Sequence, residues 1–425
     1  MKHLPRPGRR HSVPARSRRA PKPERAPLPR GFGTIWSTVA IDLVGFGIII
    51  PVLPLYAERF GASPAVVGAL FATFSVAQLL LAPVWGAVSD RMGRKPVLVL
   101  SLAGTAVGSL LTGLAGSLPL LFAGRLLDGA SGASVSVAQA AVADVAEPGE
   151  RARLFGLLGA AFGLGFVAGP ALGALSALGG ARVPFLVAAA LAGVNALVGV
   201  RRLPETNART VAAPFDRPPL AVADGLGAEG LGGLDPGAAV DPEPLGAPGR
   251  EVGRLLGVAF GALVAFSAFE ATFALFGERR LGFRPASTGA VFTVVGLALA
   301  LVEGVLVHPT VHRFGELGTL RVGLACNAVG LLLLAAVRSW WALVPALLAL
   351  VLGQGLATPS LTAAVAGGAA AHRRGGVLGL QQSAGGLARV VGPVAGGLAF
   401  EHLGVPSPYL LGAAAMVACA LLVPR

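Results

Sequence analysis

The sequence predicts an all-α membrane protein with twelve transmembrane helices in two six-helix, pseudo-symmetric halves. First, only 13% of its residues are charged and its mean hydropathy is +0.73, whereas a soluble chain carries about 25% charged residues. Second, twelve apolar segments approach the length of about 20 residues that crosses a bilayer. Third, charge and glycine motifs of the first half recur in the second.

The twelve expected spans form two groups of six. They cover residues 34–57, 65–89, 97–115, 120–143, 153–177, 183–200, 254–277, 286–309, 319–337, 341–364, 376–400 and 407–424. The stretch 201–253 is rich in Gly, Pro, Ala and acids and has no helical apolar period, which predicts a linker. The expected organisation is therefore a tail at 1–33, a bundle at 34–200, a cytoplasmic linker at 201–253 and a second bundle at 254–425.

Positive charge indicates how the chain lies in the membrane. Residues 1–30 hold ten Lys/Arg and one acid, so they supply +9 of the net +13. This proline-rich tail lacks an apolar run, which predicts a disordered cytoplasmic segment and no cleavable signal peptide. Beyond the tail, the loops on the linker side hold 16 Lys/Arg and the opposite loops hold six. This bias predicts a plasma or inner membrane protein with both termini in the cytoplasm, and no nucleic-acid partner.

The residues that usually support enzymes, metals or cofactors are scattered. Cys326 and Cys419 are isolated in apolar segments, and among the six histidines only His308 and His312 are four apart, which is a weak pair. The glycine-rich run at 225–233 lacks the Lys-Ser/Thr of a phosphate loop. We therefore expect no enzyme, metal or cofactor, and an ion gradient rather than ATP as the energy source.

A short charged hairpin, Gly86–Lys95, joins the second and third spans. Its glycines allow a tight turn, and Asp90 can accept from Arg94. We expect an ion-pair latch that includes Asp144, lies at the cytoplasmic face and stabilises an outward-facing state. The alternative is a plain topology signal in which Asp90 is solvated. The expected latch residues are Gly86, Asp90, Arg91, Gly93, Arg94 and Asp144.

The second half contains a worn copy of this hairpin at His312–Glu316, where His312 replaces the acid and Glu316 the second arginine. That copy is therefore expected to be degraded or pH-sensitive. Other positions align more closely, at an offset of 223: Gly156/Gly379, Leu157/Leu380, Gly163/Gly386, Leu164/Leu387, Gly169/Gly392, Pro170/Pro393 and Gly173/Gly396. Pro64/Pro285 and Gly68/Gly289 match at 221, and Glu58/Glu278 at 220. A parallel six-plus-six repeat follows.

Ionisable residues inside spans are costly and usually functional. We expect Asp42, just before Gly45 and Gly47, and Glu270 to be the acids that couple protons or substrate. They are not repeat equivalents, so the site is asymmetric and suits a substrate with one cationic or polar end.

Four further ionisable groups belong to the candidate site. Arg125 is expected to adjust the charge environment of the site in the first half. It is either paired with Asp128, three residues on, or bonded to carbonyls of the first span. Arg389 is an anion contact or packs beside Pro393. Glu303 is a coupling acid or only an interface charge.

Small residues are expected to shape the fifth and eleventh spans. Gly165, Gly169 and Gly173 form a stripe for close helix contact. The pairs Gly169-Pro170 and Gly392-Pro393 remove a backbone donor and are expected to kink their helices around a central cavity. Four phenylalanines either line an apolar pocket there or pack in the core: Phe166, Phe266, Phe269 and Phe273.

Four motifs carry a resemblance to a known family. The Gly86–Lys95 hairpin resembles the signature loop of the major facilitator superfamily, and Gly165–Gly173 resembles its antiporter motif in helix 5. The segment Asp42–Pro54 resembles helix 1 of the drug:proton antiporter branch with twelve helices. Gly124–Ala133, followed by Asp144, is similar to helix 4 of tetracycline efflux proteins.

The resemblance implies a secondary transporter that exports a hydrophobic or amphiphilic drug-like molecule in exchange for protons, by alternating access in a monomer. Its expected partners are that small molecule, protons and the lipid bilayer. Two alternatives stay open: a proton-coupled uptake symporter for a sugar or an organic anion, and a non-transporting scaffold or sensor on the same fold.

Overall fold

A computed structural model describes residues 28–146, 150–207, 249–369 and 374–424. Most of the expected tail and of the expected linker, 1–27 and 208–248, lie outside the described residues. The helices are α1 Phe32–Ile49, α2 Leu53–Glu58, α3 Pro64–Met92, α4 Arg94–Gly113, α5 Leu118–Ser131, α6 Ser134–Val145, α7 Arg151–Ala177, α8 Val183–Arg202, α10 Arg250–Leu281, α11 Pro285–Val305, α12 Val307–Ala336, α13 Trp340–Gly367, α14 Arg374–Leu403 and α15 Ser407–Leu422.

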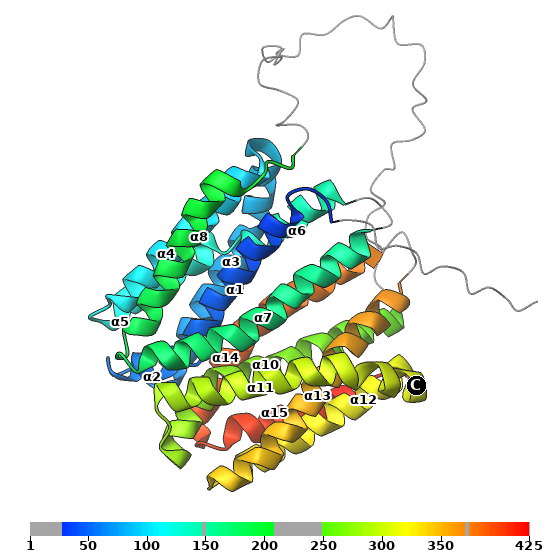
Figure 1. Cartoon of the computed structure of the whole chain (residues 1–425). Helices are drawn as coiled ribbons and strands as arrows, with labels where there is room; N and C mark the ends of the chain where they lie inside the picture. Colours follow the sequence, from blue (N-terminus) through cyan, green and yellow to red (C-terminus); the bar gives the residue numbers. More distant parts are fainter. Residues whose placement is uncertain (1–27, 147–149, 208–248, 370–373, 425) are drawn as a thin grey trace, which may run out of the picture.

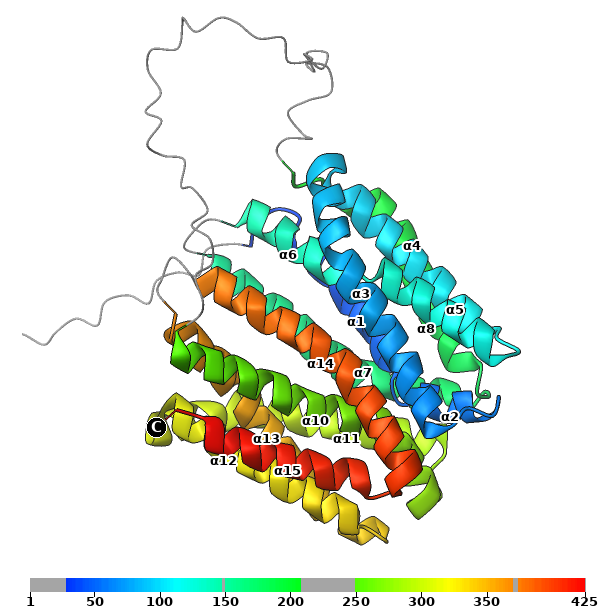
Figure 2. The ribbon, with the colours of Figure 1, turned by 180° about the vertical axis from the view of Figure 1, so that it is seen from behind.

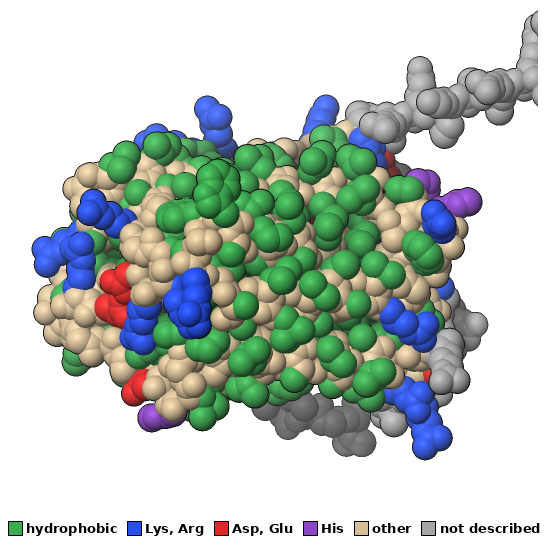
Figure 3. Space-filling view, turned by 90° about the horizontal axis from the view of Figure 1, so that it is seen from below, with side chains coloured by type: hydrophobic (Ala, Val, Ile, Leu, Met, Phe, Trp, Pro, Cys, Tyr) green, Lys and Arg blue, Asp and Glu red, His purple; other side chains and the backbone are tan. Residues whose placement is uncertain are grey.

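The helices form two groups that lie side by side (Figures 1 and 2). In the N-terminal half, α1 packs against α7 and α8, and α4 packs against α5 and α8. In the C-terminal half, α12 packs against α13 and α15, and α10 against α14 and α15. The outer face in Figure 3 carries apolar side chains over most of its area, with charged side chains mainly toward its two ends. That distribution suits a bundle whose middle contacts lipid.

Nine of the described helices are long and apolar enough to cross a membrane. The expected spans at 120–143, 376–400 and 407–424 fall short for separate reasons. The first is interrupted between α5 and α6, and α15 has only 16 residues. Helix α14 has 30 residues but is diluted by glycine and by Gln381 and Gln382.

One expected boundary was wrong. The first span ends at Ile49 and the chain restarts as the six-residue helix α2, because Pro51 and Pro54 interrupt helical hydrogen bonding. The worn hairpin at 312–316 forms a turn, as the sequence predicts. The range labelled α12 holds two helices that meet at Gly315, where φ is 70° and ψ is 174°, a conformation that glycine adopts without strain.

The two halves meet through α3 with α14 and α7 with α11. These contacts are main chain against main chain: a methyl group at Gly68 would collide with the carbonyl of Pro393, and one at Gly289 would collide with that of Pro170. The two contacts are repeat equivalents, at the offsets of 221 and 223 seen in the sequence. We call the end of the bundle that carries Leu203–Asn207 and Arg250 the linker end, and the end that carries α2 the far end.

Candidate functional site

Asp42 lies on α1 and contacts the interruption of the fourth span. Its Oδ2 accepts a hydrogen bond from Ser134 Oγ at 2.5 Å, and Ser134 is the first residue of α6. The charge of Asp128, on α5, also acts on Asp42. The sequence predicted Asp42 as a coupling acid but did not predict Ser134. Ser134 did not stand out as a polar residue in the sequence, because serine is common in membrane spans.

Arg125 and Asp128 form a buried ion pair within α5. Their Nη1 and Oδ2 atoms are 2.7 Å apart, and the side chains are only 2% and 6% exposed. The guanidinium also lies over the ring of Phe74, 4.4 Å from its centroid. Of the two expected roles for Arg125, the structure therefore places it with Asp128. Such a pair offsets the large desolvation cost of each charge.

Glu270 and Arg389 approach each other in the C-terminal half, on α10 and α14. Arg389 is close enough for its charge to act on Glu270, and its own side chain is exposed. Glu303 is exposed near the end of α11. Asp42 and Glu270 thus stand in different halves, each beside its own charged neighbour.

The expected aromatic pocket is largely core. Phe269 and Phe273 are buried and pack against each other with ring centroids 5.2 Å apart and ring planes tilted by 50°. Tyr409 lies edge-on to Phe269. Phe266 is partly buried against the same cluster, while Phe166 is exposed on α7. The three phenylalanines of α10 therefore stabilise the C-terminal half, because ring burial contributes strongly to packing.

The small-residue stripe of α7 packs against α1. A methyl group at Gly165 would meet Leu43, and one at Gly169 would meet Gly47. Gly173 faces Ile48 in the same way. Pro170 and Pro393 lie inside α7 and α14, which both continue past them, and Gly392 packs against Val264 and Ser267 of α10.

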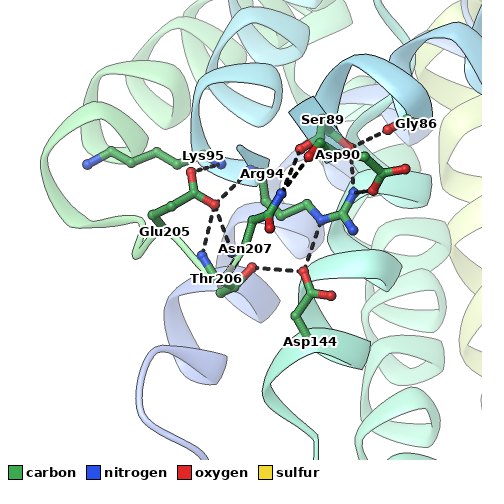
Figure 4. A network of polar contacts seen from close by, with 9 residues as sticks. All are labelled: Gly86, Ser89, Asp90, Arg94, Lys95, Asp144, Glu205, Thr206 and Asn207. Carbon is green, nitrogen blue, oxygen red and sulfur yellow. Dashed lines mark hydrogen bonds and ion pairs between the residues drawn. The ribbon is translucent and has the colours of Figure 1, made fainter. Parts of the chain in front are cut away.

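The hairpin between α3 and α4 makes the ion pairs that the sequence predicts (Figure 4). Arg94 Nη1 lies 2.6 Å from Asp90 Oδ1, and its Nε lies 2.9 Å from Asp144 Oδ2 on α6. Ser89 Oγ accepts from the same guanidinium at 2.7 Å. Gly93 has φ of 101°, which allows the turn, whereas Arg91 is exposed and Gly86 is half-buried. All these residues belong to the N-terminal half.

Three residues that follow α8 complete this cluster, and the sequence did not predict them. Glu205 Oε1 accepts from the backbone N–H of Arg94 at 2.8 Å, and its Oε2 accepts from that of Lys95 at 3.1 Å. The carboxylate therefore caps the N-terminus of α4, where N–H groups lack helical partners. Asn207 donates to the carbonyl of Asp90 at 2.9 Å, and Thr206 donates to Asp144. The sequence feature that could have pointed to this cluster is the acidic residue directly after Pro204.

The worn copy on α12 makes no comparable pairs among the contacts described for it. Arg313 instead lies over the ring of its neighbour Phe314, at 5.4 Å. Phe314 and Glu316 are exposed. The two halves therefore differ at the linker end, as the sequence predicts.

At the far end, polar contacts join the two halves. Glu401 Oε2, on α14, accepts from Ser63 Oγ at 2.6 Å and from the backbone N–H of Ala65 at 3.0 Å. Arg279, at the end of α10, lies 3.7 Å from Glu58 of α2 and over the ring of Phe400. Burial, and next the hydrogen bond with Glu278, raises the pKa of Glu58 to about 7. Together with the glycine contacts, these residues hold the far ends against each other.

The sequence model of the Major Facilitator Superfamily matches residues 35–326 and 255–425. The chain belongs to that superfamily. It is 32% identical to a tetracycline resistance protein, class G, of Vibrio anguillarum, over 84% of this chain and 86% of the relative. It is 34% identical to a class C tetracycline resistance protein of Escherichia coli, over 77% and 79%.

Solved structures of transporters share the fold of this superfamily member. The crystal structure of the human organic anion transporter MFSD10 (TETRAN) matches with a TM-score of 0.65 and 27% identity, covering 93% of this chain and 99% of the other. The nucleoside transporter NupG matches with a TM-score of 0.70 at 13% identity, covering 92% and 98%, which supports the fold alone.

Proposed function

We propose that this transporter exports hydrophobic or amphiphilic drug-like molecules in exchange for protons. The observation that carries the proposal is Asp42, a carboxylate inside the first span with one hydroxyl donor on a neighbouring helix. An antiporter needs an acid at which a proton and a substrate compete. The tetracycline resistance proteins that match over most of the chain support export of this class of compound.

Glu270 is the proposed second coupling acid, in the other half. Arg389 beside it supplies a positive charge near this carboxyl group. Because the two acids differ in position and in neighbours, the proposed site is polar at two unlike points and otherwise apolar.

The positions of the contacts between the halves support alternating access. The glycine contacts and the polar contacts of Glu58, Ser63 and Glu401 lie toward the far end. We assign the linker end to the cytoplasm, because it carries the excess of Lys/Arg. The conformation would then be closed outside, and rocking of one half against the other would expose the site alternately. The proposed working unit is a monomer with both termini in the cytoplasm.

The hairpin latch fits the same cycle. Arg94 holds Asp90 and Asp144 within the N-terminal half in this conformation. We propose that the assembled hairpin presents a fixed surface to the C-terminal half when the cytoplasmic side closes, which stabilises the outward-facing state.

The test is proton movement driven by substrate in inverted vesicles. Tetracycline added to vesicles with an imposed proton gradient should release protons in the wild type, and Asp42→Asn or Glu270→Gln should abolish the release. Glu251→Gln is the matched control, because Glu251 is an exposed acid in the first turn of α10. A panel of toxic amphiphiles, tested on cells with and without the protein, extends the search. Equal proton movement in the wild type and both acid variants would refute the assignment.

A second substrate class, organic anions, is favoured by one observation. Arg389 is an exposed arginine beside Glu270, and MFSD10, a structural relative, is named an organic anion transporter. The test is uptake of a fluorescent organic anion into the same vesicles. Uptake that is lost in Arg389→Gln and retained in Glu251→Gln would favour organic anions over drug-like amphiphiles as the substrate class.

A further inference from the structure

The fourth span is broken between α5 and α6 at Gly132 and Ala133. Helix α5 ends at Ser131 and α6 begins at Ser134. Gly132 has φ of −70° and ψ of 50°, outside the helical region. A break inside a membrane span leaves carbonyl groups without helical donors, and each of these needs another partner.

Side chains of α3 and α4 supply those partners. Trp85 Nε1 donates to the carbonyl of Ala130 at 2.7 Å, and Gln78 Nε2 donates to that of Gly132 at 3.1 Å. Ser101 Oγ donates to the carbonyl of Ser131 and accepts from the N–H of Ala133 at 3.2 Å. Three neighbouring carbonyls are thus satisfied by three side chains, so the break is a fixed feature of the fold.

The break places Ser134 at the start of a helix. In a helix interior, a serine hydroxyl usually bonds to a carbonyl of its own helix three or four residues earlier. The break turns the backbone before Ser134, and its hydroxyl reaches across to Asp42 of α1 instead. Ser134 is itself 4% exposed, so water does not replace this donor easily.

The other neighbours of Asp42 do not supply a comparable donor among the described contacts. Arg125 is bound by Asp128, whose own negative charge acts on Asp42. Helix α7 approaches α1 through glycines, and Asn195 of α8 donates to the carbonyl of Thr38.

We propose that Ser134 is a positioning residue for Asp42. Its hydroxyl holds the ionised carboxylate against the N-terminus of α6, and arrival of a proton or a cationic substrate at Asp42 releases that contact. The first and fourth spans are thereby tied together in one state of the acid and freed in the other. This inference rests on the proposed role of Asp42 as a coupling acid.

The test measures Asp42 directly, on the full chain in liposomes. Infrared spectra recorded during a pH titration give the band of the protonated Asp42 carboxyl, identified by its loss in Asp42→Asn. Removing a hydrogen bond to the charged form disfavours that form. Ser134→Ala should therefore move the midpoint of this band to higher pH, by about half a unit or more. Ser134→Thr keeps the hydroxyl and should leave the midpoint unchanged.

Ser136→Ala is the matched control, because Ser136 donates to the carbonyl of Ala133, the residue just before its own helix, at 3.0 Å and does not contact Asp42 in the described contacts. The inference is overturned if Ser134→Ala titrates like Ser136→Ala, or if no band depends on Asp42. The proposed function is judged separately by substrate-driven proton movement. A shift in the Ser134→Ala titration without any transported compound would uphold the positioning role and count against export.

Discussion

Glu401 accepts a hydrogen bond from Ser63 at 2.6 Å, although the two residues belong to different halves and are 338 positions apart. The same carboxylate accepts from the backbone N–H of Ala65, so it caps the first turn of α3 from across the interface. The backbone N–H of Ala65 keeps this acceptor only while the far ends stay together, whereas that of Val66 is capped by Ser63 within the same half.

Glu401→Ala should loosen the far end. The N–H of Ala65 then loses its acceptor, and conformations with separated far ends gain population. Spin labels at Arg182, in the turn before α8, and at Trp341, in the first turn of α13, are exposed and should report a longer or broader distance distribution. His402→Gln, the exposed neighbour, is the control; identical distributions in wild type and Glu401→Ala would refute the capping role.

Glu58 should make stability depend on pH. Its pKa is raised from 4.5 to about 7, so the folded protein binds more protons at this carboxyl than the unfolded chain does between those values. Stability should fall as the pH rises through that window and stay level above it. Glu58→Gln removes the effect, so it should exceed the wild type by about 1 kcal/mol at about pH 8, once the partial exposure of the carboxyl is allowed for, and match it at about pH 4.

Thermal unfolding in detergent at the two pH values checks this prediction. Glu251→Gln, an exposed acid elsewhere, serves as the control. A stability difference between wild type and Glu58→Gln that is the same at both pH values would contradict it.

Glu205→Ala should destabilise the N-terminal half. The substitution leaves the backbone N–H groups of Arg94 and Lys95 without their acceptor. Loss of a helix cap costs about 1–2 kcal/mol. The midpoint of thermal unfolding should fall accordingly, while Thr206→Val, which removes only a 3.5 Å contact to Asp144, should have little effect. A larger fall in the unfolding midpoint for Thr206→Val than for Glu205→Ala would contradict the capping role of Glu205.

Neutralising one member of the Arg125–Asp128 pair should be costly. Asp128→Asn leaves a buried guanidinium without its counter-charge, which costs about 3–5 kcal/mol. The double variant Arg125→Met/Asp128→Leu removes both charges and should recover most of that stability. Chemical unfolding of the three proteins measures the difference. A double variant that is no more stable than Asp128→Asn would show that the pair does not act as a unit.

The sequence predicts the parts of the fold that depend on local composition. Long apolar runs gave most of the spans, and the short spacing between Asp90 and Arg94 predicted their ion pair. The break at Gly132 was missed because Gly and Ser are also ordinary residues at contacts between membrane helices.

Contacts between distant segments were the least predictable. Glu205 looks like a solvated acid at the start of a polar stretch, and its role depends on where α8 ends relative to α4. The match between Glu58 and Glu278 was visible in the repeat. The contact of Glu58 with Glu278 and Arg279, however, depends on how the two halves dock. Asp42 was predicted as a functional acid, while its donor required knowledge of the break.

The glycine contacts of Gly68 with Pro393 and of Gly289 with Pro170 have a mechanical consequence. Where side chains interlock, sliding one helix past another requires many rotamers to change together. At these two crossings, the backbones of facing helices lie close together, so few side chains there would have to change rotamer in the proposed rocking of the halves. The two crossings are repeat equivalents and would act as a matched pair of pivot points. A methyl group added at Gly68 or Gly289 would collide with the facing carbonyl group and hinder that motion.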